Sequence, residues 1–363
     1  MTKQLIENCQ YCSQFSKQNG EDPIGTASTA DHWLVFELPQ PWRKEMFTTD
    51  PLINQLIPLL KKLFFRQGIL VRPVAIAPDR EYSHPHLTRV IHFWRPQKCF
   101  AQYNRYEYLV PKADSGDFAI SLLHTLSGRK NELQPFQQYL QPTQPIRDLL
   151  ICTHTQVDLA CGRFGTPLYR QLRKQYAHQS QLRIWQSTHF GGHQFAPTLL
   201  DLPLGQFWGH LEPHIVETLI TQQGSLEQIR PFYRGWSGLT KFEQIAEGEM
   251  WMQMGWDWQH YPKTGRIKRK GLQGLQKVLY PLLRYIPLNI LQLWLEQWTS
   301  KAAWVDIELC YQDSPASDLK RCTFRVLKDH TVNSAKKSAA HRGDALAIEP
   351  VQQYRVEQIV KPH

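Results

Sequence analysis

The chain has 363 residues, of which 42% are hydrophobic and 20% charged. This composition excludes a disordered protein, and the length predicts two or three domains. The net charge of +10 favours acidic partners, but no nucleic-acid-binding motif accompanies it, so nucleic acid is not an expected ligand. No run of 18 apolar residues and no signal-peptide pattern is present, which predicts a cytoplasmic protein without a transmembrane segment.

The first part of the chain predicts a small α/β unit behind a polar lead-in. Residues 1–30 have no periodic apolar pattern and are expected to be this lead-in. A unit over 31–145 follows, in the order strand, helix, three strands, helix. Its predicted elements are 32–39, 51–66, 69–76, 89–96, 105–111 and 117–128. Asp50 and Pro51 are typical of a helix start.

Residues 146–226 repeat this order of elements. The predicted strand, helix, three strands and helix lie at 149–154, 165–179, 182–189, 198–203, 206–211 and 214–224. A parallel strand pair joined by a helix, then a hairpin and a helix, is the thioredoxin order. We therefore predict an α/β (α+β) thioredoxin-like domain at 146–226, with a degenerate, metal-free thioredoxin-like half before it.

Residues 227–363 predict an extension of helices followed by three short strands. Its first part is aromatic and has helical spacing, and 263–271 is a basic run. The stretch 272–298 is apolar at helical spacing but is interrupted by Pro281 and Pro287. Such a stretch either packs on its own protein or lies on a membrane surface, and we expect the first.

Four residues with metal-binding side chains fall at predicted strand ends of the thioredoxin-like domain. Cys152 ends one strand, and Cys161 follows after a short loop. His189 ends the next parallel strand, and His193 lies in the loop after it. Because the carboxyl ends of parallel strands share one edge of a sheet, we expect these four side chains to meet.

Thiolates and imidazoles bind both iron and zinc, so the residue types alone leave the metal open. Two Cys and two His are one ligand set of a 2Fe–2S cluster. Four nearby glycines would let the backbone approach closely and turn amides toward cluster sulfurs: Gly162, Gly165, Gly191 and Gly192. A zinc-stabilised interaction module and a thiol–disulfide oxidoreductase stay open as alternatives.

The spacing C-x8-C, the downstream HFGGH and the segment PLGQFWGHL resemble the sucrase/ferredoxin-like family of thioredoxin-like ferredoxins. GEDPIGTA (20–27) and PQPW (39–42) extend the similarity, which covers about residues 10–240. The resemblance implies a 2Fe–2S cluster with Cys152 and Cys161 on one iron and His189 and His193 on the other. It implies electron transfer rather than substrate conversion. The family name does not imply cleavage of sucrose.

Two further expectations concern partners and the remaining cysteines. The basic charge predicts an acidic redox partner, such as a ferredoxin or a flavin reductase. Cys9 and Cys12 form a C-x2-C pair in the lead-in. We interpret this pair as incidental, because no second half of a metal site lies nearby and no strand precedes it.

Overall fold

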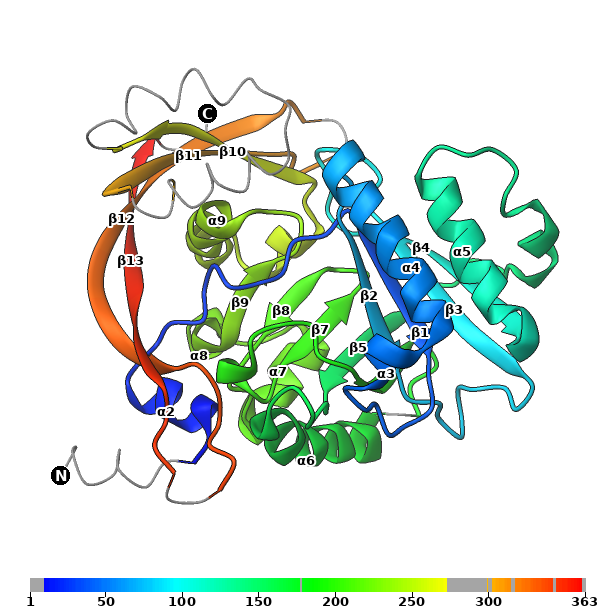
Figure 1. Cartoon of the computed structure of the whole chain (residues 1–363). Coiled ribbons are helices and arrows are strands. Elements are labelled where there is room, and N and C mark those ends of the chain that lie inside the picture. The colour runs from blue at the N-terminus through cyan, green and yellow to red at the C-terminus, as the bar shows by residue number, and fades with distance from the viewer. Residues whose placement is uncertain are drawn as a thin grey trace.

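The computed structural model describes residues 10–176, 178–272, 299, 302–314, 317–341 and 344–360. Nine strands in these ranges form one mixed sheet, drawn in Figure 1. They are β1 (His32–Glu37), β2 (Val71–Ile76), β3 (Leu87–Trp94), β4 (Asn104–Pro111), β5 (Arg147–Cys152), β6 (Leu182–Ser187), β7 (Leu199–Leu202), β8 (Gln206–Trp208) and β9 (Tyr233–Trp236). Their order across the sheet is β4-β3-β1-β2-β6-β5-β7-β8-β9.

Five of the eight described α-helices begin without a hydrogen bond from a capping side chain, and α4 is one of the exceptions. They are α2 (Cys12–Gln18), α3 (Met46–Thr49), α4 (Pro51–Lys62), α5 (Ser115–Leu126), α6 (Leu159–Tyr176), α7 (Val216–Thr221), α8 (Leu226–Ile229) and α9 (Lys241–Met254). At the start of α4, the Asp50 carboxylate accepts hydrogen bonds from the amides of Leu52 and Ile53, at 2.8 and 3.1 Å. Asp50 and Pro51 therefore start this helix as their types predict.

Two successive segments of the chain build the sheet with the same topology. In the first, β1 and β2 are parallel, and β3 and β4 add antiparallel on the other side of β1. In the second, β5 and β6 are parallel, and β7 and β8 add in the same way. The predicted α/β fold of thioredoxin-like order is confirmed. The domain limits at 145/146 and 226/227 stay predictions, since one sheet runs through both segments.

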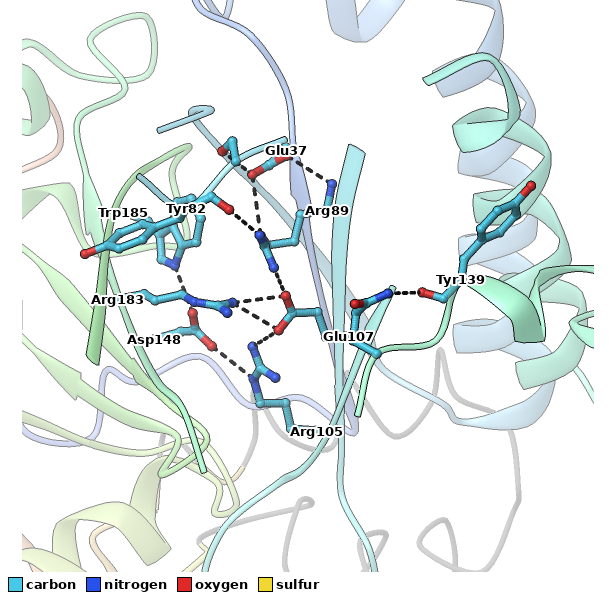
Figure 2. A network of polar contacts seen from close by, with 11 residues as sticks. Glu37, Tyr82, Arg89, Arg105, Glu107, Tyr139, Asp148, Arg183 and Trp185 are labelled. Atoms are coloured by element: carbon cyan, nitrogen blue, oxygen red, sulfur yellow. Dashed lines mark hydrogen bonds and ion pairs between the residues drawn. The ribbon is translucent and has the colours of Figure 1, made fainter. Parts of the chain in front are cut away.

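The two segments meet through a shared hydrophobic core, a short strand contact and a buried network of charges. β2 pairs with β6 only at Ile76 and Ser187. Figure 2 shows Glu107 of β4 surrounded by arginines from both segments: Arg89, Arg105 and Arg183. β4 and β6 lie four positions apart in the sheet, so this contact requires the sheet to curl. The charges fill the concave side, where each arginine has a carboxylate partner.

Helix α6 starts earlier than the predicted range of 165–179. It begins at Leu159, because the Asp158 carboxylate accepts a hydrogen bond from the amide of Ala160 at 2.8 Å. Aspartate before a first turn is a common helix start. Cys161 therefore lies in the first turn of α6 rather than in a loop, and Gly162 and Gly165 lie inside the helix.

The carboxyl-terminal third differs from the prediction in two places. Tyr233–Trp236 was expected to be helical but forms β9, an edge strand paired with β8. The basic run is strand β10 of a second, four-stranded sheet. Residues 273–298, which make up almost all of the predicted apolar stretch, lie outside the described residues. The second sheet contains β10 (Lys263–Lys270), β11 (Trp304–Tyr311), β12 (Lys320–Ala335) and β13 (Ile348–Val360). The three predicted carboxyl-terminal strands are thus present, but β12 and β13 are not short, since they have 16 and 13 residues.

The lead-in has regular structure, contrary to expectation, because it packs on the rest of the molecule. Helix α2 buries Phe15 and Cys12, which are 2% and 0% exposed. Figure 1 shows β12 and β13 curving along the side of the molecule, so that β12 ends and β13 starts beside α2. The amide of Ala339, in the connection between these two strands, donates to the carbonyl of Gln10 at 2.8 Å, so this connection packs on the lead-in. Within the described ranges, no helix has the length and apolarity needed to cross a bilayer.

Candidate metal centre

Three of the four predicted ligands converge at the carboxyl ends of β5 and β6. Cys152 ends β5, His189 follows β6, and Cys161 projects from the first turn of α6. His189 Nδ1 lies 3.6 Å from Cys152 Sγ and 3.8 Å from Cys161 Sγ. The ligand atoms of all three lie within 4.8 Å of one another, a spacing that suits a shared metal.

The two thiols are buried and interact directly. Both are free cysteines, so no disulfide joins them. Burial alone would raise the pKa of Cys152, but hydrogen bonds from Cys161 and His189 outweigh it and lower this pKa to about 5. The hydrogen bond to Cys152, together with burial, raises the pKa of Cys161 well above its usual value. Cys152 is therefore the thiolate of the metal-free pair, and Cys161 must lose its proton to become a ligand.

His193 lies beside this group but faces a second one. Its ring centroid is 5.7 Å from that of His189. Its Nδ1 atom lies 3.4 Å from Cys12 Sγ and 3.6 Å from Asp158 Oδ2. Burial lowers the pKa of His193, which favours the neutral imidazole that metals bind. The structure thus places the fourth predicted ligand beside His189 but in a separate group with Cys12 and Asp158, whose contacts with it are to Nδ1.

Cys12 and Asp158 contact Nδ1 of His193, and Ser338 in turn holds Asp158. The Asp158 carboxylate accepts hydrogen bonds from the Ser338 amide at 2.8 Å and the Ser338 hydroxyl at 2.5 Å, besides the Ala160 amide. Burial raises the pKa of Asp158, but the hydrogen bonds from Ser338 have the larger, opposite effect. The pKa therefore lies below its usual value, and the carboxylate is ionised. Its acceptor sites are largely occupied, which suits a group that orients His193 better than a direct metal ligand.

The interpretation of Cys12 as incidental is wrong. Its Sγ atom contacts His193, and burial raises its pKa to about 12, so it is a neutral thiol. Asp158 and His193 follow Cys12 in the sequence by 146 and 181 residues. No local sequence signal connects residues so far apart. Cys9, the other member of the pair, lies outside the described residues.

The glycines at the site have two different roles. Gly191 and Gly192 have φ angles of 105° and 80° in the loop between the two histidines, which favour glycine. Gly162 and Gly165 instead allow α6 to pack closely. A Cβ on Gly165 would lie 2.0 Å from the carbonyl oxygen of Cys152. The expectation that this second pair turns loop amides inward is therefore wrong, because the pair lies inside the helix.

Arg234 of β9 is a buried neighbour of the site that the sequence pattern does not reveal. Its Nη1 donates to the carbonyl of Gly191 at 2.9 Å. Nη2 donates to the carbonyl of Thr26 at 2.7 Å, and Nε donates to the Thr26 hydroxyl at 3.1 Å. The segment GEDPIGTA, which carried part of the family resemblance, thus helps to hold the histidine loop through this arginine.

The donor set fits a thiophilic metal or an iron–sulfur cluster. It offers two thiolate sulfurs and two imidazoles in a buried place. Two buried hydroxyls beside Cys152, those of Ser187 and Thr198, have no hydrogen-bond partner among the described residues. Ser187 is the register partner of Cys152, and the carbonyl of Thr198 accepts the Cys152 amide at 3.2 Å. These hydroxyls are spare donors next to a sulfur ligand.

Comparison with known proteins gives relatives that share part of this chain. The Sucrase/ferredoxin-like family pattern matches residues 23–235. Altered inheritance of mitochondria protein 32 from Meyerozyma guilliermondii is 30% identical over 172 residues, which are 39% of this chain and 60% of that protein. Its namesake from Clavispora lusitaniae is 30% identical over 103 residues, 26% of this chain and 37% of that protein. The chain thus matches less than two thirds of either relative's length.

One solved structure is similar over a smaller part. A thioredoxin-like [2Fe-2S] ferredoxin from Aquifex aeolicus aligns with 24% of this chain and 90% of its own, at 13% identity and a TM-score of 0.21. A score this low supports no conclusion about function. The family pattern, by contrast, covers more than half of the chain and includes both cysteines and both histidines of the site. The chain therefore belongs to the sucrase/ferredoxin-like family.

Proposed function

We propose that this protein is a one-electron carrier that holds a 2Fe–2S cluster through Cys152, Cys161, His189 and His193. The observation that carries the proposal is the convergence of the first three within 4.8 Å, with the His193 ring beside that of His189. When bound, such a cluster supplies one-electron oxidation and reduction at a potential set by its ligands.

The residues of the chain divide the work at this site. Cys152 and Cys161 provide soft, anionic ligands to one iron, and the two histidines provide neutral ligands to the other. Cys12 and Asp158 occupy the Nδ1 side of His193, which leaves Nε2 for the metal. A ligating histidine commonly gives its other ring nitrogen to a carboxylate, which fixes the orientation of the ring.

An electron carrier needs a partner, and the net charge of +10 favours an acidic one. We propose an acidic protein of the ferredoxin or flavin reductase class. The rate of electron transfer between the two should then fall as ionic strength rises.

A cytoplasmic location stays a prediction, and cell fractionation is its test, since the relatives are named for mitochondrial inheritance.

Zinc is the second candidate for the same donor set. The compact group of Cys152, Cys161 and His189 favours it, because one tetrahedral ion needs its ligands close together. A thiol–disulfide oxidoreductase has less support. Both sulfurs are at most 1% exposed, which keeps a substrate thiol away from them.

Anaerobic purification of the full chain separates these candidates. We expect a coloured protein with visible absorption and two irons and two labile sulfides per chain. Replacing His189 or His193 by Ala should remove or strongly alter the absorption. His214→Ala is the matched control, because that side chain is 65% exposed and faces Glu212 instead. A colourless wild-type protein that contains zinc and no sulfide would contradict the cluster and support the zinc module.

A further inference from the structure

Arg234 carries a buried positive charge for which the described chain supplies no negative partner. The residue is 1% exposed. All the acceptors of its guanidinium are neutral: the carbonyls of Gly191 and Thr26, and the Thr26 hydroxyl. Its other close neighbours are the rings of Phe195 and Phe207, at 5.6 and 5.4 Å. Burying a charge without a counter-charge is costly, so arginines are seldom fully buried unless paired.

The other buried arginines of this chain show the usual solution. Arg89 and Arg105 each contact Glu107, and Arg147 binds the Asp201 carboxylate through two of its nitrogens. Each of these cations therefore has a carboxylate partner. Arg234 is different because no ion pair to it exists among the described residues, although it is the most buried of the four.

The guanidinium of Arg234 lies against the metal-binding loop. A Cβ on Gly192 would lie 2.3 Å from its Nη2 atom, so only glycine leaves it room. Burial lowers the pKa of Arg234 to about 9, and the charges of Cys152 and Cys161 act in the opposite direction. The guanidinium therefore lies against the loop that joins His189 to His193, and the negative groups that act on its charge are the two cysteines of the proposed cluster site.

We propose that Arg234 is the counter-charge of the metal centre and favours its reduced state, an inference that rests on the proposed function. Two thiolates and two neutral imidazoles give a loaded site that is formally neutral when oxidised. It gains one negative charge when it takes one electron from a ferredoxin or flavin donor, which is oxidised by one electron. Arg234 stabilises that added charge from a buried position against the histidine loop, where screening is weak.

The same arginine also positions the loop, so the test must separate charge from structure. Arg234→Gln removes the charge and keeps part of the hydrogen bonding. Thr26→Asp keeps the arginine and adds a carboxylate as its ion-pair partner, because Nε of Arg234 already donates to the hydroxyl at this position. Thr26→Asn makes nearly the same change in shape without adding a charge. Arg234→Lys keeps the charge and loses the planar donor geometry.

The midpoint potential of the loaded full chain, measured by anaerobic spectroelectrochemistry, is the readout. Arg234→Gln and Thr26→Asp should each make reduction about tenfold less favourable, a fall of about 59 mV for a one-electron couple. Arg234→Lys and Thr26→Asn should shift the potential much less. Arg173→Gln is the control for losing a buried arginine, because Arg173 lies on α6 and binds Asp79.

Thr26→Asp keeps the proposal testable if Arg234→Gln fails to fold. Suppose that the wild-type protein binds a normal cluster and that Thr26→Asp has the same midpoint potential as the wild type. This result would overturn the role of Arg234 as counter-charge and leave the proposed function in place. A potential that falls equally in Thr26→Asn and Thr26→Asp would also overturn it, because loop distortion would then be the cause. A wild-type chain that binds no cluster would refute both.

Discussion

Replacing Gly165 by Ala should damage both the fold and the metal site, because this glycine sets the distance between α6 and β5. It lies one turn after Cys161 in the helix. The added Cβ would lie 2.0 Å from the carbonyl oxygen of Cys152 and 3.1 Å from its carbonyl carbon. Both are backbone atoms, so no side-chain rotation relieves the contact. The helix itself has to move away from the strand.

The size of the effect follows from this geometry. Real Cβ contacts stay above 3.0 Å, so α6 must shift by at least 1.0 Å, from 2.0 to 3.0 Å. Overpacking of this kind costs up to about 3 kcal/mol, and Ala regains about 1 kcal/mol of helix propensity over Gly. We therefore expect a net loss of about 2 kcal/mol. Metal sites tolerate displacements of only about 0.2 Å, so metal binding should fall as well.

Urea unfolding of the metal-free protein and metal content after reconstitution measure the two effects. Gly248→Ala is the matched control, because it also lies inside a helix, α9. Its Cβ would approach a methyl group of Ile24 at 3.2 Å, and a flexible side chain can yield. This variant should stay within about 1 kcal/mol of the wild type. A Gly165→Ala protein with wild-type stability and metal content would refute the close packing of α6 on β5.

Three further predictions address other parts of the molecule. Glu107→Gln should lower the free energy of unfolding by about 3–5 kcal/mol, because it removes a buried carboxylate that three arginines share and takes from Arg183 its ion pair. The exposed control Glu349→Gln should cost less than about 1 kcal/mol in the same urea titration. Burial lowers the pKa of His92 to about 3 from 6.5, so only the unfolded chain binds this proton between those values, and stability rises with pH there. Acidification from pH 7 to 5 should then cost about 2 kcal/mol through His92, and His92→Gln should remove that share from a pH series of unfolding curves. Asp158→Asn should weaken metal retention against a chelator by about 10- to 100-fold, since the carboxylate orients His193, and unchanged retention would argue against that role.

The amino-acid sequence by itself determined the order of the elements and the type of site. The strands around Cys152 and His189 are short apolar runs, and the helices between them have apolar residues at helical spacing. These patterns are local, so they can be recognised without the fold. The convergence of Cys152, Cys161 and His189 also followed, because the edge shared by parallel strands is a general rule.

Only the tertiary structure decided what surrounds this core of the site. Cys12, Ser338 and Arg234 come from a predicted lead-in and a predicted extension, and they reach the site through contacts that span 181, 180 and 43 residues of the sequence. Sequence periodicity does not reveal such contacts, because they depend on how the curved sheet, α2 and the connection between β12 and β13 pack. The burial of Arg234 is the clearest case. An arginine in a sequence looks the same whether water or a protein core surrounds its charge.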